Sequence, residues 1–392
     1  MLDTHSIMYI TKRPEVMMTL GEGSWLKDNN GKKYLDFMQG WAVNCLGHSN
    51  LGMIEALNKQ ARKVFNPSPA FYNEPMIRLA DLLTSHSNFD KVFFANSGAE
   101  ANEGAIKLAR KWGQLHKNNA FEIITFDHSF HGRTLATMSA SGKPGWDTMF
   151  APQVPGFPKA DLNDLESVKK LINKNTVAVM LEPIQGEGGV IPTTIEFMQD
   201  LRALTKKLGI LLIVDEVQSG CGRTGRLFGH QLSGIEPDIM TLGKGIGGGV
   251  PLSALLCTDA VASFVPGDQG GTYNGNPLMC AVGISVIEQL TAPGFLESVQ
   301  EKGQYLRSKL LELSSKYNLN GERGEGLLRA LILNKDIGPS LVEKAREMNP
   351  VGLLINSPRP DLLRFMPALN VSHSEIDQMI AFLDKLIPES LT

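Results

Sequence analysis

The sequence lacks the features that mark secreted and membrane proteins. It has four cysteines in 392 residues and no C-x-x-C pair, and such sparse usage is typical of a reducing compartment. The first ten residues contain no basic start followed by an apolar stretch, so they do not resemble a signal peptide. The longest apolar runs, such as 210–214, are much shorter than a membrane span. We therefore expect a cytoplasmic protein with no membrane partner.

The chain also has little net charge. Its 38 Lys and Arg residues nearly balance 41 Asp and Glu residues, and the formal net charge is −3. Because no dense basic block is present, no nucleic-acid partner is expected. Hydrophobic residues make up 42% of the chain and charged residues 20%, which excludes a disordered or fibrous protein. A globular chain of this length is expected to form about two to three domains.

The middle of the chain alternates short apolar runs with amphipathic stretches of helical pattern. Helical patterns cover 99–115 and 194–208. Because this alternation is typical of βαβ units, we expect an α/β fold with a mainly parallel sheet. The apolar runs show no polar alternation, which indicates that helices cover both faces of the sheet. The predicted strands are 91–95, 122–126, 177–181, 210–214, 238–242 and 252–257.

The two ends of the chain differ from this pattern. An Asp-Asn-Asn-Gly string at 28–31 is a hairpin-turn signal and predicts a small sheet near the N-terminus. From about Pro277 onward, helical patterns at 278–290 and 295–315 precede β-like stretches at 327–333 and 362–366. The sequence therefore predicts three parts, which are an N-terminal segment with a small sheet (1–48), a large α/β domain (49–276) and a smaller α+β C-terminal domain (277–392).

One predicted strand ends in Asp215-Glu216, at the sheet edge where α/β proteins bind ligands. A nucleotide site is one interpretation of this carboxylate. However, the Asp-Glu of a P-loop ATPase requires a G-x-x-x-x-G-K-[ST] string, which the sequence does not contain. Residues 243–248 match G-x-G-x-x-G, but the glycines at 247–249 and Pro251 would prevent the helix that a dinucleotide site requires. The nucleotide-binding alternative is therefore disfavoured.

A lysine at the end of another predicted strand is the first candidate for covalent chemistry. Most lysines are solvated surface charges, but Lys244 follows an apolar run and precedes several glycines. Glycines allow a bulky planar ligand to approach the backbone. Desolvation at this position would lower the pKa of Lys244 and make its neutral amine available for a Schiff base. Asp215 would then be the partner of a pyridinium nitrogen that must stay protonated.

A third string suits a phosphate group. Ser97-Gly98-Ala99 follows the strand at 91–95 and begins a helical pattern. Ser97 is a favourable N-cap residue, and the exposed N–H groups of a first helical turn bind anions. Taken alone the string indicates a plain capped helix, but beside Asp215 and Lys244 it indicates a phosphate site.

A fourth string, at 130–133, offers an aromatic ring and a guanidinium after the strand 122–126. Phe130 can cover the face of a planar cofactor, and Arg133 can bind a substrate carboxylate through two parallel hydrogen bonds. His128 and His131 have a spacing that can bind a metal ion. Because no cysteine stands nearby in the sequence and the two histidines alone do not make a metal site, no metal is expected.

Taken together and in this order, five strings resemble the class III (ω-amino-acid) aminotransferases, which are fold type I enzymes that use pyridoxal 5′-phosphate. The resemblance runs from roughly Gly21 to the C-terminus, and within the class the chain is most similar to the branch whose amino donor is N-acetylornithine. The resemblance implies a homodimer whose active site is shared across subunits. The five strings are at 94–103, 130–133, 181–189, 215–225 and 241–249, and those typical of the branch are at 42–48, 222–225 and 363–367.

The resemblance implies that the ω-amino group of N-acetylornithine passes to 2-oxoglutarate, a ping-pong step of arginine biosynthesis that gives N-acetylglutamate semialdehyde and glutamate. Lys244 would bind the cofactor and act as general base and acid. Asp215 would pair with the ring nitrogen, and Gln218 would contact the ring oxygen O3′. Phe130 would stack on the ring. The phosphate would be held by Ser97, Gly98 and Ala99, and by Thr272 of the second subunit.

Three charged residues are implied to bind the substrates. Arg133 would bind one carboxylate of N-acetylornithine or 2-oxoglutarate, and Arg364 would bind a second. Glu187 would act as a switch, because one pocket must accept a donor and a dicarboxylate in turn. A movable glutamate can neutralise an arginine when no substrate carboxylate is present.

The chain departs from the family pattern near Thr272. The family commonly reads His-Gly-Ser-Thr-Tyr there, whereas this chain reads Gln269-Gly-Gly-Thr-Tyr273. Gly271 therefore lacks a hydroxyl that lies near the donor in enzymes of this branch. Ornithine, succinylornithine and 4-aminobutyrate are alternative donors. An aminomutase or decarboxylase, which needs no 2-oxo acid acceptor, is an alternative on the same fold.

Overall fold

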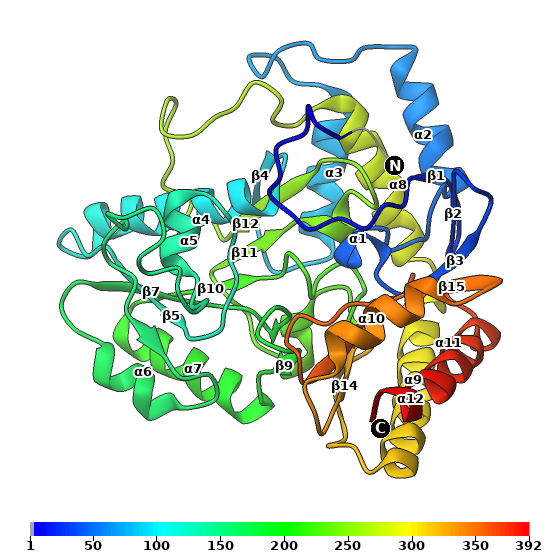
Figure 1. Ribbon diagram of the computed structural model, residues 1–392. Helices are drawn as coiled ribbons and strands as arrows, with labels where there is room; N and C mark the ends of the chain where they lie inside the picture. Colours follow the sequence, from blue (N-terminus) through cyan, green and yellow to red (C-terminus); the bar gives the residue numbers. More distant parts are fainter. Residues whose placement is uncertain (1–3, 392) are drawn as a thin grey trace.

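The structure is a computed structural model that describes residues 4–391. At its centre lies a seven-stranded sheet with the order β4-β12-β11-β10-β7-β5-β6 (Figure 1). Neighbouring strands are parallel except that β12 runs antiparallel to both β4 and β11. The predicted mainly parallel sheet is thus confirmed. The strands are β4 (Lys91–Ala95), β5 (Glu122–Phe126), β6 (Lys159–Ala160), β7 (Thr176–Leu181), β10 (Leu211–Asp215), β11 (Ile239–Leu242) and β12 (Ser253–Cys257).

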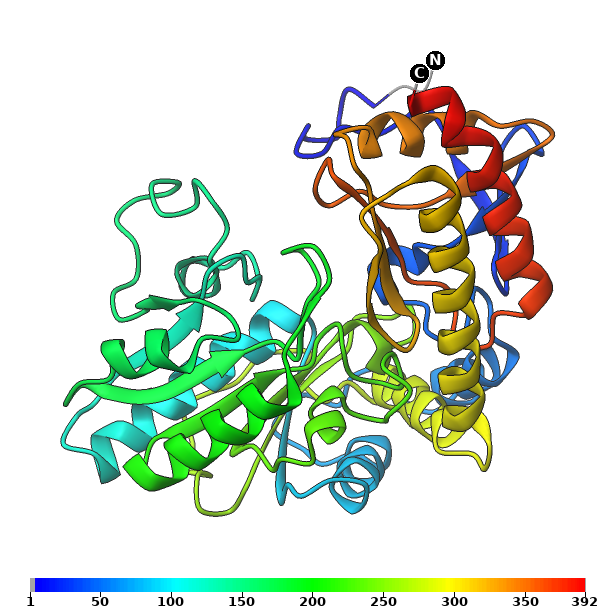
Figure 2. The same ribbon diagram turned by 90° about the horizontal axis from the view of Figure 1, so that it is seen from below.

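Helices cover both faces of this sheet, as the absence of polar alternation predicted (Figure 2). In β10, Leu211 and Ile213 belong to the hydrophobic cluster beneath α4, whereas Leu212 and Val214 belong to the cluster beneath α7. Each strand residue therefore packs against one of the two helical layers. The first layer contains α4 (Gly98–His116) and α5 (Leu135–Ala140), and the second contains α6 (Leu165–Leu171) and α7 (Ile195–Leu208).

Three further helices pack together beside the β4 edge of the sheet. α8 contacts both α2 and α3, and α3 also contacts β4. Leu79 and Leu83 of α3 are fully buried in the cluster that α8 shares. The bounds of these helices are α2 (Leu51–Ala61), α3 (Glu74–Ser85) and α8 (Pro277–Leu290).

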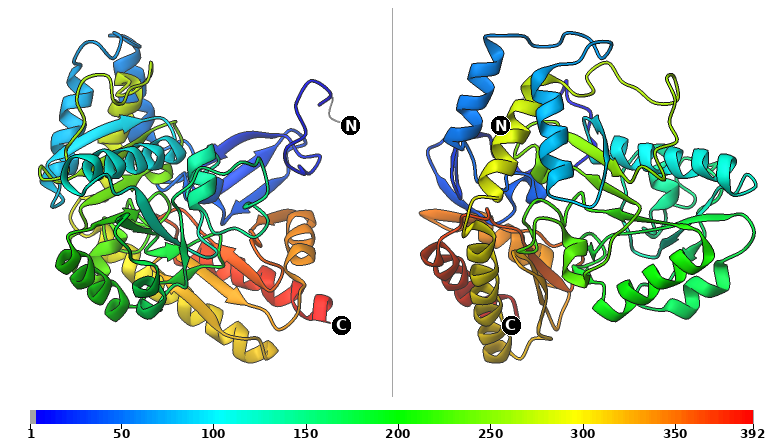
Figure 3. Two further views of the ribbon diagram at one scale, coloured as in Figure 1. Left: turned by 90° about the vertical axis from the view of Figure 1, so that its left-hand side faces the viewer. Right: turned by 180° about the vertical axis from the view of Figure 1, so that it is seen from behind.

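The predicted N-terminal hairpin is present, but its sheet takes a fourth strand from the other end of the chain (Figure 3). β1 (Met18–Glu22), β2 (Trp25–Asp28) and β3 (Lys33–Asp36) pair antiparallel. β15 (Val351–Leu354) then pairs with β3 in parallel. The N-terminal segment therefore shares its sheet with the C-terminal part, a long-range pairing that local patterns do not show. The three-part division of the chain stays a prediction.

The C-terminal part has its own antiparallel sheet, in the order β13-β14-β16. α9 packs against this sheet and against α11. This arrangement places β16, and with it Arg364, next to the large sheet's ligand edge. The remaining C-terminal elements are α9 (Phe295–Tyr317), β13 (Glu322–Glu325), β14 (Leu328–Ile332), α10 (Gly338–Glu347), β16 (Leu362–Phe365), α11 (His373–Leu386) and α12 (Pro388–Leu391).

Short elements complete the fold, and several of them border the site. Among residues 4–391, no single helix is long and apolar enough to cross a membrane. The pair α8 and α9, bent by 71° at the break between them, meets that length and composition only when both are taken together. The short elements are α1 (Gln39–Ala42), β8 (Ile184–Gln185), β9 (Ile191–Pro192) and the 3₁₀ turns η1 (Gly229–Ser233) and η2 (Lys244–Ile246).

Candidate active site

A cavity of about 240 Å³ lies at the carboxyl ends of the central strands. Asp215 is the last residue of β10, and Lys244 begins the turn that follows β11. Parallel strands deliver their carboxyl ends to one edge, which is where open α/β sheets bind ligands. The fold brings eight of the eleven predicted site residues into the lining, namely Gly98, Ala99, Phe130, Arg133, Glu187, Asp215, Gln218 and Lys244.

The innermost side of the cavity is a buried hydrogen-bond network around Asp215, whose side chain is 3% exposed. Asn102 Nδ2 donates to Asp215 Oδ2 at 2.7 Å, and His131 Nδ1 lies 2.7 Å from the same oxygen. Val217 N donates to Asp215 Oδ1 at 3.0 Å. Thr241 Oγ1 in turn donates to Asn102 Oδ1 at 2.6 Å. These bonds hold the carboxylate in one orientation at the end of the sheet.

Lys244 lies in this cavity with its amine unpaired. Its φ of 44° is in the left-handed region, where side chains other than glycine are uncommon. Within residues 4–391, no hydrogen bond or ion pair engages its Nζ. Burial lowers the pKa of Lys244 below its ordinary value, although Glu187, Glu182 and Asp215 oppose that shift. A lowered pKa makes a neutral, nucleophilic amine more accessible.

The N-terminus of α4 forms the anion-binding end of the cavity. Ser97 caps the helix, because its Oγ accepts a hydrogen bond from Glu100 N at 3.3 Å and its own N donates to Glu100 Oε2 at 3.1 Å. Glu100 N is thus engaged, but within residues 4–391 no hydrogen bond engages the N–H groups of Gly98 and Ala99, so both are available to an anion. Gly98 has no room for a side chain, because a Cβ there would lie 2.6 Å from Val217 Cγ1.

The outer side of the cavity holds an ion pair between Arg364 and Glu187. Arg364 is fully buried, and its Nη1 lies 2.8 Å from Glu187 Oε1. Asn356 Oδ1 accepts from Arg364 Nε at 2.9 Å, and Gln218 Oε1 accepts from Nη1 at 3.4 Å. Burial acts to raise the pKa of Glu187, but the neighbouring guanidinium holds that pKa below its ordinary value. Arg364 itself is not among the residues that line the cavity, whereas its partner Glu187 is.

Phe130 and Arg133 stand at the entrance of the cavity. Phe130 N donates to Glu182 Oε1 at 2.9 Å, which fixes the backbone at the ring. The Arg133 side chain is exposed, and in the described part of the chain it makes neither a hydrogen bond nor an ion pair. Its guanidinium instead lies 5.4 Å from the ring centroid of Trp146. All five of its N–H donors are therefore available to a substrate carboxylate.

Sequence reasoning did not assign three polar residues of the cavity to the cofactor site: Asn102 and Glu182 were not singled out, and His131 was considered only as a metal ligand. Asn102 and His131 both bond to Asp215, and Glu182 is buried beside them. Burial, together with the charge of Asp215, raises the pKa of Glu182 well above its ordinary value. All three lie inside the strings that carry the family resemblance. An Asn between the buried Ala101 and Ala105 of α4 was the clearest available signal, because a buried amide requires partners.

Thr272 does not reach this cavity. It lies in the exposed segment between β12 and α8, and its carbonyl oxygen accepts from Asn66 Nδ2 at 3.3 Å. The segment is attached to α4 of the same chain, since Lys107 Nζ donates to Asp268 O at 2.6 Å and also to Gln269 Oε1. Lys111 forms an ion pair with Asp268 at 3.1 Å. Ser97 likewise is not part of the lining and acts here as the helix cap.

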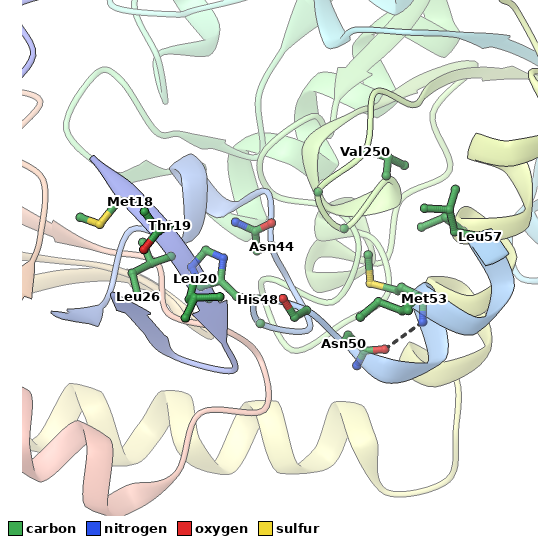
Figure 4. A pocket seen from close by; sticks show the side chains of 17 residues that line it. Met18, Thr19, Leu20, Leu26, Asn44, His48, Asn50, Met53, Leu57 and Val250 are labelled. Carbon is green, nitrogen blue, oxygen red and sulfur yellow. Dashed lines mark hydrogen bonds between the residues drawn. The ribbon is translucent and has the colours of Figure 1, made fainter. Parts of the chain in front are cut away.

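A second hollow, of about 330 Å³, lies between β1, the segment 44–57 and the turn 248–250 (Figure 4). Apolar side chains such as Leu20, Met53 and Leu57 dominate its lining. His48 is its one titratable side chain, and its Nε2 pairs with Asp36 at 2.8 Å. The lining of this hollow contains no lysine, cysteine or carboxylate side chain, whereas the cavity at Lys244 brings a lysine and three carboxylates together.

The cavity fits a planar cofactor with a phosphate at one end and a protonated ring nitrogen at the other. The capped helix supplies the phosphate end, and the oriented Asp215 supplies the opposite charge for the nitrogen. Among the described residues, His131 Nε2, Gln218 Nε2 and Arg364 Nη2 are buried without a hydrogen-bond partner, so each can still bond to a bound group. No group of three or more His, Cys, Asp or Glu residues in 4–391 is placed to hold a metal ion.

Comparisons with known proteins point to one family. The family model of the class-III aminotransferases matches residues 9–387. The acetylornithine aminotransferase of Ralstonia nicotianae is 76% identical over 386 residues, which are 97% of each chain.

Solved structures give the same family. The ornithine aminotransferase of Toxoplasma gondii superposes with a TM-score of 0.91 at 31% identity, covering 97% of this chain and 93% of that chain. The N-acetylornithine aminotransferase of Stenotrophomonas maltophilia has a TM-score of 0.84 at 34% identity, and 96% of each chain is covered.

Proposed function

Because this chain belongs to the class-III aminotransferases, we propose that it transfers the ω-amino group of N-acetylornithine to 2-oxoglutarate in the cytoplasm, as a step of arginine biosynthesis. The products are N-acetylglutamate semialdehyde and glutamate. The donor is taken from the relative that is 76% identical and carries that activity in its name. The enzyme class itself, a pyridoxal-phosphate-dependent aminotransferase, follows from the family.

The observation that carries the proposal is the ion pair between Glu187 and the buried Arg364 at the edge of the cavity, at 2.8 Å. A pocket that serves two substrates in turn must neutralise its arginine when the bound substrate brings only one carboxylate. Glu187 is 30% exposed and lies beside the entrance, so it can move away without unfolding the site. Arg364 then binds the second carboxylate of 2-oxoglutarate, and Arg133 binds the carboxylate that donor and acceptor share.

The chain's own groups would hold the cofactor and move the protons. Pyridoxal phosphate, when bound, supplies a ring that accepts the electron pair of a broken C–H bond. Asp215 would keep the ring nitrogen protonated, held by Asn102 and His131. Gln218 would bond to the ring oxygen and Phe130 would cover the ring face. The Lys244 amine would bind the cofactor and then carry the proton between the two carbon atoms.

The phosphate site is the part of the proposal that needs a second subunit. Ser97, Gly98 and Ala99 would bind the phosphate from the start of α4, and Thr272 would complete the site from the partner of a homodimer. The segment that carries Thr272 is attached to Lys107 and Lys111 of α4 through Asp268 and Gln269. This attachment supports a role for Thr272 in the partner's site, because it holds Thr272 on the outer surface of its own subunit. Gln269, which replaces the usual histidine, accepts one of these bonds.

The test is a donor panel. The purified protein with pyridoxal phosphate is mixed with N-acetylornithine and 2-oxoglutarate, and glutamate formation is followed. We expect a kcat/KM for N-acetylornithine at least about tenfold above those for ornithine, succinylornithine and 4-aminobutyrate. A higher kcat/KM for one of these three would replace the donor but keep the class. Turnover of N-acetylornithine without any 2-oxo acid would instead indicate the aminomutase or decarboxylase alternative.

A further inference from the structure

A buried tryptophan at the entrance of the cavity has no role in the reaction derived so far. Trp146 lies in the segment between α5 and β6 and is only 5% exposed, although Gly145 and Asp147 on either side are exposed. Its backbone is fixed at both ends, because Trp146 N donates to Lys143 O at 3.1 Å and Gln153 Nε2 donates to Trp146 O at 2.8 Å. The indole is therefore a rigid part of the entrance.

The indole contacts the two entrance residues that the proposed function uses. The ring centroids of Trp146 and Phe130 are 5.7 Å apart with an interplanar angle of 60°. The Arg133 guanidinium lies 5.4 Å from the Trp146 centroid. Both separations are within the range of favourable aromatic and cation–π contacts. One side chain thus contacts both the residue proposed to cover the cofactor ring and the residue proposed to bind a substrate carboxylate.

The contact with Arg133 matters because little else holds that side chain. Arg133 is exposed and, within residues 4–391, makes no hydrogen bond or ion pair. An unsupported arginine loses considerable rotamer freedom when it binds a ligand. A cation–π contact restricts the guanidinium but uses none of its N–H donors. Trp146 therefore orders Arg133 before the substrate arrives and leaves its donors free.

Lys143 adds a second positive charge at the same ring. Its Nζ lies 5.4 Å from the Trp146 centroid, and its charge is among those that lower the pKa of Glu187. The indole thus holds two cations near the carboxylate that covers Arg364. This arrangement favours anionic over neutral substrates at the entrance.

We propose that Trp146 is a positioning residue that holds Arg133 and Phe130 in place for a substrate carboxylate, and that it thereby selects carboxylate-bearing substrates. This inference rests on the proposed function. Trp146 does not touch the reacting atoms, so its effect falls on substrate binding and on KM, while kcat is largely kept.

The test compares Trp146→Leu and Trp146→Phe with wild-type holoenzyme. Binding of glutarate, a dicarboxylate that cannot react, is measured by titration calorimetry, and KM and kcat are measured with N-acetylornithine. Trp146→Leu should raise the Kd of glutarate and the KM about tenfold, with kcat within about twofold. Trp146→Phe keeps a ring and should raise both by only about twofold to threefold. Trp112→Leu, a loss of tryptophan on α4, should leave the Kd of glutarate unchanged.

A double-mutant cycle separates this role from general packing. If Trp146 acts through Arg133, the double variant Trp146→Leu/Arg133→Ala binds glutarate no more weakly than Arg133→Ala alone. If Trp146→Leu weakens glutarate binding as much in the Arg133→Ala background as in the wild-type background, the proposal is overturned. An unchanged Kd in Trp146→Leu would also overturn it. Should Trp146→Leu fail to fold, Trp146→Phe in the two Arg133 backgrounds decides the question.

The binding measurement also separates this inference from the choice of donor. Wild-type protein that binds glutarate through Arg133 but does not turn over N-acetylornithine would refute the donor and leave the role of Trp146 intact. Wild-type protein that does not bind glutarate would refute the role of Trp146, whatever the donor.

Discussion

The inner and outer sides of the cavity are built in different ways. The inner side, formed by Asp215, Asn102, His131 and Thr241, is buried, and Asp215 Oδ2 alone has two partners at 2.7 Å. The outer side, formed by Phe130, Arg133, Trp146 and Glu187, uses ring contacts and one ion pair. The inner groups would have to stay fixed under every substrate, whereas the outer groups would have to accept two different ones.

This difference has a physical cause. A buried carboxylate is stable only when hydrogen bonds or charges compensate for its lost hydration, and several short bonds leave it one orientation. A ring contact or a partly exposed ion pair is weaker and restricts a side chain without locking it. Substitutions on the inner side should therefore lower kcat, and substitutions on the outer side should change which substrate is bound.

The largest effect should come from Lys244 on the inner side. Lys244→Ala removes the only amine proposed to bind the cofactor and carry the proton, so turnover should fall by roughly 10⁴-fold or more. Steady-state kinetics measures the loss, and the yellow absorption band of the cofactor-loaded protein should be altered. Thermal unfolding should stay close to wild type. A variant that keeps its turnover would refute the mechanism.

Asp215→Asn should have the next largest effect. It keeps the shape of the side chain but removes the charge proposed to face the ring nitrogen. We expect kcat to fall by about 10²–10³-fold, the cost of losing one preorganised electrostatic group.

A matched control for Asp215 lies at the other end of the same sheet. Asp238 precedes β11 and pairs with Arg202 through two bonds of 2.7 and 2.8 Å, far from the cavity lining. Asp238→Asn should lower the free energy of unfolding and leave kcat nearly unchanged. If both variants lost stability and neither lost kcat, Asp215 would be a structural residue only.

Glu187→Gln tests the outer side. It leaves Arg364 without a counter-charge, so the arginine should bind dicarboxylates at all times. We expect the donor half-reaction to slow by about 10–100-fold while 2-oxoglutarate binding is kept or strengthened. Single-turnover kinetics measures the rate of each half-reaction, and the ratio of the donor to the acceptor rate reports the change.

Glu322→Gln is the control for this switch, because Glu322 pairs with the buried Arg329 at 2.9 Å outside the cavity. It should lower the free energy of unfolding without changing the ratio of the two half-reaction rates.

The pH dependence of this ratio gives a second check on Glu187. Arg364 holds the pKa of Glu187 below its ordinary value. The ion pair is therefore fully formed when the pH is above that ordinary pKa, and it is lost only when the pH falls through the lowered pKa. The ratio should therefore be constant from about pH 6 to 8.

The smallest effect, on stability, is expected where the segment between α5 and β6, which carries Trp146, is attached to the sheet. Lys159 Nζ donates to Thr125 Oγ1 and Ser139 O, both at 2.7 Å, and to Ala140 O at 3.0 Å. It thereby fixes the start of the segment that carries Trp146. Burial lowers the pKa of Lys159 to about 8.

Between pH 8 and the higher pKa of the unfolded chain, unfolded Lys159 binds more protons than folded Lys159, so raising the pH stabilises the fold. Wild type should gain about 1–2 kcal/mol of unfolding free energy relative to Lys159→Met when the pH rises from 8 to about 10. Urea unfolding at both pH values measures this gain. An equal change in both proteins would show that Lys159 does not titrate in this window.

Much of the fold could be predicted from local pattern. The ends of all six predicted strands lie within one residue of those in the structure, because strands buried on both faces leave continuous apolar runs. β6, with two residues, left no such run and was not predicted. The pairing of β15 with β3 was also not predicted, because it joins residues more than 300 apart and depends on no local signal.

The sequence by itself determined the reactive groups. A lysine, a carboxylate and a capped helix each stand where an apolar run ends, and a parallel sheet must bring such ends to one edge. Only the tertiary structure decided how these groups are held. Asn102 and His131 acquire Asp215 as a partner through packing between elements far apart in the chain. Trp146 acquires Phe130 and Arg133 through the folding of the long segment between β5 and β6. The exposed Thr272 lies outside the lining of the chain's own cavity. A residue's chemistry is local, whereas its orientation and burial depend on what the rest of the chain places beside it.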